Sequence, residues 1–182
     1  GFGGQEPAEG QRRFINGADN FLRILDRLSP LCADHALRRL GISPHSLRAV
    51  TPQLLGEVIA GLDRLDAGAP IHTHVAEQTR EVEDCRAWSG KRPVEFLIDA
   101  FDISQRWCAI HATHMTDAET AGLARSGAIA GLCPTTEANL GDGIFPATDY
   151  LSQGGAIAIG SDSHISVSPA EELRLLEYSQ RL

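Results

Sequence analysis

The chain has 182 residues, 42% of them hydrophobic and 22% charged, which is typical of a globular protein with one sizeable core. Its 24 acidic and 16 basic side chains give a formal net charge of −8. This charge argues against nucleic acid or an anionic membrane surface as the main partner. A small molecule is the expected partner.

Cysteine use and the first residues bear on the compartment of the protein. Cys32, Cys85, Cys108 and Cys133 lie far apart without a C-x-x-C pair, which predicts reduced thiols in a cytoplasmic protein. No apolar run reaches the roughly 18 residues of a membrane span, and GFGGQEPAEGQRR lacks the apolar core of a secretory signal. Since no initiator methionine is present, we expect the chain to be a piece of a longer protein.

Short apolar runs alternate with helical patterns along the chain. Helices are predicted over 14–28 and over 52–66, the second with Thr51 as N-cap and Pro52 at its first position. Strand-like apolar runs occupy residues 40–50, 69–77, 107–114, 127–136 and 155–163. Continuous apolar runs separated by helices indicate a parallel sheet buried on both faces, and therefore an α/β fold.

Capping residues mark two of the later helices. Thr116 with Glu119, and Ser168 with Glu171, have the spacing of capping boxes. Gly127 stands where the helix that follows Thr116 should end, just before the next strand.

Polar side chains stand at or just beyond the carboxyl ends of successive strand-like runs. They are His45 with Arg48, His74 with Glu77, His111 with His114, Thr136 with Glu137, and Asp162 with His164. A (β/α)8 barrel builds its active site from this end, whereas an open doubly wound sheet binds its ligand where the strand order switches. The pattern therefore predicts a partial (β/α)8 TIM-type barrel, roughly strands 4 to 8 with their helices, in a single domain over residues 1–182.

His74 and Asp162 are candidate metal ligands. An imidazole and a carboxylate suit zinc, which lowers the pKa of a bound water to about 7. His72 and His74 face the same side of their strand, and His74 is nearer the carboxyl end, so His74 is the candidate. A lone histidine in a strand is more often a hydrogen-bonded core residue, so its neighbours must decide.

Glu77, His111 and Arg48 are candidates for catalysis and substrate binding. Glu77, three residues past His74, can exchange protons with a water there, although a loop glutamate alone is usually solvated. His111 either polarises a substrate or bonds to a backbone carbonyl in the core. Arg48, beside His45, either offers a planar fork to a substrate carboxylate or covers the barrel rim.

These residues lie in longer blocks that are similar to a known family. The blocks include FGGQ, PHSLRAVTP, HVAEQ, HATH, PTTEANLGDGIFPATD and GSDSH. Through them the chain resembles the amidohydrolase superfamily, its deaminase branch with a single metal, and within that branch the formiminoglutamate deiminases. The likeness runs through essentially the whole chain.

The resemblance implies a role for each candidate. His74 from the fifth barrel strand and Asp162 from the eighth would hold one divalent metal, with zinc expected. Glu77 would move protons, together with Asp162, and His111 would sit against the reacting carbon. The substrate would be held by His45 and Arg48.

The implied activity is hydrolytic deimination of N-formimino-L-glutamate, a step of histidine degradation that gives N-formyl-L-glutamate and ammonia. The implied partners are a small acidic substrate and a second copy in a homodimer, with no nucleic acid and no membrane. Two alternatives stay open: a nucleobase- or nucleoside-type deaminase of the same superfamily, and a non-catalytic barrel fragment.

The spacing of the candidate ligands agrees with this strand numbering. Asp162 follows His74 by 88 residues, which fits about three β/α units of roughly 30 residues each. A full barrel takes about 250 residues. We therefore expect the H-x-H metal ligands of the first strand to lie outside this chain.

Overall fold

The computed structural model describes residues 2–33 and 35–182. Contacts within the chain divide it into two compact units, Gly1–His72 and Thr73–Leu182. The single domain over residues 1–182 stays a prediction.

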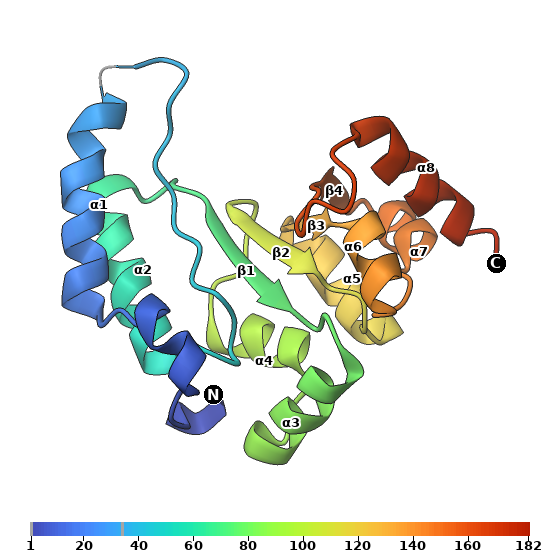
Figure 1. Ribbon diagram of the computed structural model, residues 1–182, viewed down its shortest axis with the longest axis horizontal. Helices are drawn as coiled ribbons and strands as arrows, with labels where there is room; N and C mark the ends of the chain where they lie inside the picture. The colour runs from blue at the N-terminus through green and yellow to red at the C-terminus, as the bar shows by residue number, and fades with distance from the viewer. Residues whose placement is uncertain (1, 34) are drawn as a thin grey trace. The chain divides into compact units, whose positions relative to one another are not determined.

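Two packed helices form the frame of the first unit. Its elements are the 3-10 helices η1 (Phe2–Gly4) and η2 (Glu9–Phe14) and the helices α1 (Ala18–Ala33) and α2 (Pro52–Asp66). The helices α1 and α2 lie side by side (Figure 1). They approach so closely that a Cβ at Gly61 would clash with the Leu22 side chain. Glycine at this position therefore permits the packing of the two helices.

The helix predicted over 52–66 is confirmed, and the one predicted over 14–28 is displaced. Thr51 Oγ1 accepts a hydrogen bond from the Leu54 N–H (3.2 Å), and Pro52 is the first helical residue. The helix α1 begins only after Gly17, because an Asn-Gly pair costs more in a helix interior than at its start.

The apolar run over 40–50 does not form a strand. Ile42 makes one isolated parallel bridge with Ile71. Pro44 has no N–H to donate, and the chain turns at Ser46. The pairing at Ile42 therefore does not extend into a strand.

A parallel sheet organises the rest of the chain. Its strands are β1 (Ile71–Val75), β2 (Trp107–His111), β3 (Ile129–Leu132) and β4 (Ala156–Ile159), in the order β1-β2-β3-β4. Cys108 lies opposite Ile129, and Ala130 opposite Ile157, in parallel register. A doubly wound sheet reverses its strand order, so this sequential order confirms the α/β fold of a partial (β/α)8 barrel.

Helices follow every strand of the sheet (Figure 1). They are α3 (Thr79–Ser89), α4 (Pro93–Ala100), α5 (Asp117–Ser126), α6 (Pro134–Leu140), α7 (Ala147–Ser152) and α8 (Pro169–Ser179). The helices α3, α4, α5 and α7 pack in succession, and α6 packs against α8. In β1, Ile71, Thr73 and Val75 are buried, while His72 is exposed and His74 is half-buried on the other face.

The predicted caps are largely confirmed. The Thr116 hydroxyl accepts from the Glu119 N–H (3.2 Å), and the Glu119 carboxylate accepts from the Thr116 N–H (2.9 Å). Gly127 ends α5 with a φ of 79°. At α8 only half of the box forms, because Glu171 accepts instead from the Ser166 hydroxyl.

The four cysteines are free, as predicted, and three of them are buried. Throughout residues 2–33 and 35–182, the helices are too short or too polar to span a membrane.

Tyr150→Phe is expected to lower the free energy of unfolding by about 1–2 kcal/mol. The fully buried Tyr150 hydroxyl donates to the Ala128 carbonyl at 2.6 Å, and the substitution leaves that carbonyl without its partner. Urea unfolding measures the loss. The control is Tyr178→Phe, which removes an exposed hydroxyl. Equal unfolding midpoints for the two variants would contradict the assignment.

Candidate functional site

Backbone strain gathers at the carboxyl ends of the strands. The non-glycine residues with positive φ in the described chain are Ala76 (51°), His111 (68°), Ala112 (49°), Asp162 (43°) and His164 (60°). Each such residue costs roughly 1–2 kcal/mol. Such strain persists where surrounding contacts fix the backbone, and it is common at active sites. This edge of the sheet is therefore the candidate functional site.

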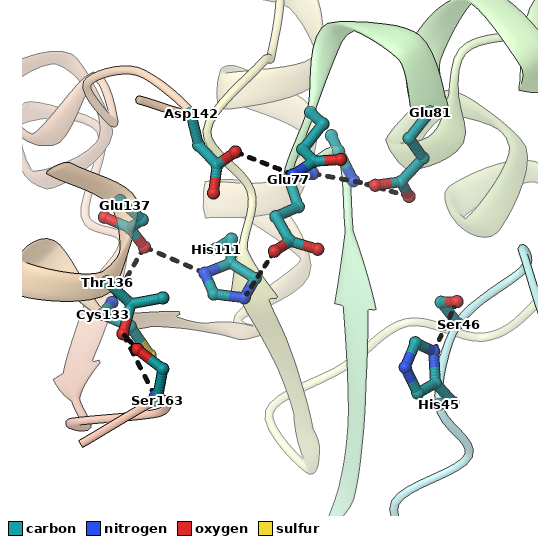
Figure 2. Close-up of polar contacts among 12 residues, drawn as sticks. His45, Ser46, Glu77, Glu81, His111, Cys133, Thr136, Glu137, Asp142 and Ser163 are labelled. Atoms are coloured by element: carbon teal, nitrogen blue, oxygen red, sulfur yellow. Dashed lines mark hydrogen bonds and ion pairs between the residues drawn. The ribbon is translucent and has the colours of Figure 1, made fainter. Parts of the chain in front are cut away.

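His111 is the central side chain of the edge (Figure 2). It ends β2 and is only 1% exposed. Its Nδ1 lies 3.1 Å from Glu137 Oε1 and its Nε2 lies 3.7 Å from Glu77 Oε1. The ring stacks on that of His74, with 5.6 Å between the centroids. The histidine therefore contacts carboxylates rather than a backbone carbonyl, which was the other interpretation of its place in the sequence.

The loop after β1 is held by a buried carboxylate. Glu81, at the start of α3, accepts the backbone N–H groups of Ala76 and Glu77, each at 3.0 Å. These two bonds fix the positive φ of Ala76 and the direction in which the chain leaves His74. The Glu77 side chain consequently turns toward His111 (Figure 2).

The loop after β4 brings Asp162 to the same edge. Thr136 Oγ1 lies 3.2 Å from the Ser161 carbonyl oxygen and accepts from the Ser163 N–H, also at 3.2 Å. Both neighbours of Asp162 are thus tied to α6. The Asp162 carboxylate is exposed, and its charge acts on His111.

The pKa of His111 reflects these surroundings. Burial of the ring lowers the pKa, but the hydrogen bond that His111 donates to Glu137 and the charges of Glu77, Glu137 and Asp162 raise it. The net result is a raised pKa. The carboxylates therefore stabilise the imidazolium form in spite of burial.

The sequence assigned no role to three residues that the structure places here. Glu81 and Glu137 are buried carboxylates that hold the loop backbone and His111. Asp142 accepts from the Gln78 side chain at 3.0 Å and joins the loops after β1 and β3. Glu137 had a signal in the sequence, since it follows a strand end, but Glu81 and Asp142 had none.

His45 and Arg48 belong to the first unit. His45 is exposed and its Nδ1 lies 2.8 Å from Ser46 Oγ, while Arg48 is half-buried. Their part in substrate binding stays a prediction. Of the candidates, His74, Glu77, His111 and Asp162 are the ones that the second unit brings to one edge.

The family model for the amidohydrolase family matches residues 16–181. The chain belongs to this family. A formimidoylglutamate deiminase of Pseudomonas aeruginosa is 60% identical over 185 residues, covering 100% of the chain and 39% of that protein. A 5-methylthioadenosine/S-adenosylhomocysteine deaminase of Nitratidesulfovibrio vulgaris is 32% identical, covering 82% of the chain and 33% of that protein.

Solved structures agree with the fold. A crystal structure of an amidohydrolase from Brucella melitensis has a TM-score of 0.93 and 56% identity, covering 100% of this chain and 40% of that one. An adenosine deaminase from Xanthomonas campestris with bound zinc has a TM-score of 0.83 and 26% identity, covering 90% of this chain and 37% of that one. The chain spans about two fifths of the length of the Pseudomonas aeruginosa and Brucella melitensis proteins.

The edge of the sheet fits part of a metal site. His74 offers a half-buried imidazole and Asp162 an exposed carboxylate, two donors that zinc accepts. A tetrahedral shell takes four ligands, so these two residues would need others to complete it. A second group of donor atoms, from His111, Cys133 and Glu137, lies within 4.8 Å of one another.

Glu81→Gln is expected to weaken the loop after β1. The amide nitrogen would oppose one of the two backbone N–H donors, and a hydrogen bond to a charged group is worth about 1.5–3 kcal/mol. We expect the free energy of unfolding, measured with urea, to fall by about this amount. The matched control is Glu83→Gln on the exposed face of α3. A loss of the same size in the control would contradict this role of Glu81.

Proposed function

We propose that this chain forms part of the active site of a metal-dependent hydrolase that deiminates N-formimino-L-glutamate. The products are N-formyl-L-glutamate and ammonia. The observation that carries the proposal is the 60% identity, over the whole chain, to the Pseudomonas aeruginosa formimidoylglutamate deiminase. A cytoplasmic location stays a prediction.

The candidate site supports a hydrolytic reaction. Its candidate residues come from three different strand ends: the His74 ring stacks on that of His111, Glu77 lies 3.7 Å from His111 Nε2, and the charge of Asp162 acts on His111. Catalytic residues of (β/α)8 barrels come from the ends of several strands in this way. The 5-methylthioadenosine/S-adenosylhomocysteine deaminase of Nitratidesulfovibrio vulgaris is more distant, at 32% identity.

A divalent metal, with zinc as the proposed ion, would be held by His74 and Asp162 and would supply the Lewis acidity that makes water a nucleophile at neutral pH. Carboxylates of this chain accept and deliver the protons of the reaction. Glu77 accepts a proton from the attacking water, with Asp162 as a second acceptor. Glu77 then delivers a proton to the departing nitrogen.

His111 stabilises the reacting centre. Its Nε2 points toward Glu77 while its Nδ1 is held by Glu137. Water adds to the formimino carbon, the bond to the imino nitrogen breaks, and ammonia leaves. His111 donates to the negative charge that develops during addition.

The proposed substrate is a small dicarboxylate. A guanidinium binds a carboxylate through two parallel hydrogen bonds, and Arg48 with the adjacent His45 is the proposed contact for one of its carboxylates.

The test uses an exchange chimera, in which this chain replaces the matching segment of the Pseudomonas aeruginosa relative. We expect the chimera to release ammonia from N-formimino-L-glutamate. Asp162→Asn should reduce the rate by more than about 100-fold, because it removes a metal ligand and a proton acceptor. The matched control is Asp149→Asn, which changes an exposed aspartate of α7.

Other outcomes of this test decide between the alternatives. Ammonia release from 5′-methylthioadenosine or S-adenosylhomocysteine, and not from N-formimino-L-glutamate, would establish a nucleoside-type deaminase. The 182-residue chain alone should be inactive, since two ligands do not complete a metal shell. Turnover by the chain alone would contradict this account of the site.

Arg48→Met in the chimera should raise KM for N-formimino-L-glutamate by about 10-fold or more, since a paired carboxylate loses about 1.5–3 kcal/mol of binding. The reaction after binding should be less affected. Steady-state kinetics measure both constants, with Arg64→Met on the exposed face of α2 as the control. An unchanged KM would show that Arg48 does not bind the substrate and instead covers the rim of the barrel.

A further inference from the structure

We propose that Glu137 is a positioning residue for His111. It fixes the orientation of the imidazole ring and keeps the proton on Nδ1, so that Nε2 is the nitrogen presented to the reacting group. The inference rests on the proposed deiminase function and deepens it.

The hydrogen bond between His111 and Glu137 determines the tautomer. The distance between Nδ1 and Glu137 Oε1 is 3.1 Å. An ionised carboxylate only accepts hydrogen bonds, so Nδ1 must be the donor. Nδ1 therefore keeps its proton in the neutral ring and in the imidazolium. In the imidazolium, Nε2, which lies 3.7 Å from Glu77 Oε1, carries the second proton and can donate it to the reacting centre.

Glu137 is itself held in place by the backbone. The residue is 3% exposed, and its Oε1 also accepts from the Cys133 N–H at 2.8 Å. Cys133 is the N-cap of α6, and the Glu137 N–H donates back to the Cys133 carbonyl at 2.9 Å. The carboxylate and the first turn of α6 therefore fix each other.

Contacts of the two residues that precede Glu137 hold the helix that carries it. Glu172 of α8 accepts from the Thr135 N–H at 2.9 Å and from its hydroxyl at 2.5 Å. Thr136 is tied to Ser161 and Ser163 in the loop after β4. A carboxylate held this rigidly can orient a histidine, as the partners of catalytic and metal-binding histidines do.

A metal held by His111, Cys133 and Glu137 is the competing arrangement. Their donor atoms lie within 4.8 Å of one another. Burial, together with nearby acidic charges, raises the pKa of the Cys133 thiol to about 12. Glu137 Oε1 already accepts from the Cys133 N–H at 2.8 Å and lies 3.1 Å from His111 Nδ1, so the hydrogen-bonded pair of His111 and Glu137 accounts for the arrangement of these groups.

The experiment compares Glu137→Ala and Glu137→Gln in the exchange chimera. Selective ¹⁵N labelling of histidine reports which ring nitrogen of His111 carries the proton, with His111→Asn used to assign the signal. Steady-state kinetics give kcat and KM, and elemental analysis gives the zinc content. The matched control is Glu119→Ala, since Glu119 is also a buried glutamate that holds a helix start, but that of α5, which carries none of the proposed site residues.

We expect Glu137→Ala to lose the single Nδ1–H tautomer of His111. Its kcat should fall by about 10- to 100-fold, with KM little changed and zinc retained. Glu137→Gln keeps an acceptor oxygen, so it should retain the tautomer and recover most of kcat. Glu119→Ala should lower the melting temperature but leave the His111 signal and kcat unchanged.

Three results would overturn the inference. In the first, Glu137→Ala keeps both the Nδ1–H tautomer and kcat. In the second, Glu137→Ala loses its zinc, which would place the metal among His111, Cys133 and Glu137. In the third, Glu119→Ala changes His111 and kcat as Glu137→Ala does, so that a general loss of packing is what matters. An inactive parent chimera would overturn the proposed function, while the NMR signals would still decide how His111 is held.

Discussion

Buried glutamates hold the backbone at the carboxyl edge of the sheet. Glu81 accepts hydrogen bonds from two backbone N–H groups in the loop after β1. Glu137 accepts from the N–H of the α6 N-cap residue, and Glu172 accepts from the N–H of Thr135. A buried carboxylate is costly unless its oxygens are hydrogen-bonded. Each glutamate and the loop that it binds therefore stabilise one another, and the strained residues at the strand ends depend on these bonds.

This framework explains why the chemistry centres on His111. Its left-handed backbone turns the ring out of β2, and carboxylates lie at both of its ring nitrogens (Figure 2). Glu137 approaches from a helix that is hydrogen-bonded to α8 and to the loop after β4, whereas Glu77 comes from a loop and is less buried. The rigid carboxylate suits positioning, and the more exposed one suits proton transfer with water.

The sequence predicted the local features of the fold better than it predicted the contacts between residues of the site. Thr51 and Gly127 were readable as caps because capping depends on neighbouring residues alone. The strand-end positions of His74 and His111 followed from the apolar runs and their alternation. The role of Glu81 could not be predicted, because a glutamate in a helical pattern is usually exposed to solvent. Its role depends on the position of the loop whose N–H groups it accepts. The strand expected over 40–50 failed because Pro44 outweighs the apolar residues around it.

The position of the metal tests the central claim most directly. A crystal of the exchange chimera grown with zinc, and measured at the zinc absorption edge, would locate the ion by its anomalous scattering. The account predicts a peak bound by His74 and Asp162, with His111 Nδ1 still hydrogen-bonded to Glu137. A peak among His111, Cys133 and Glu137, or ordered density for the site without any zinc peak, would contradict it.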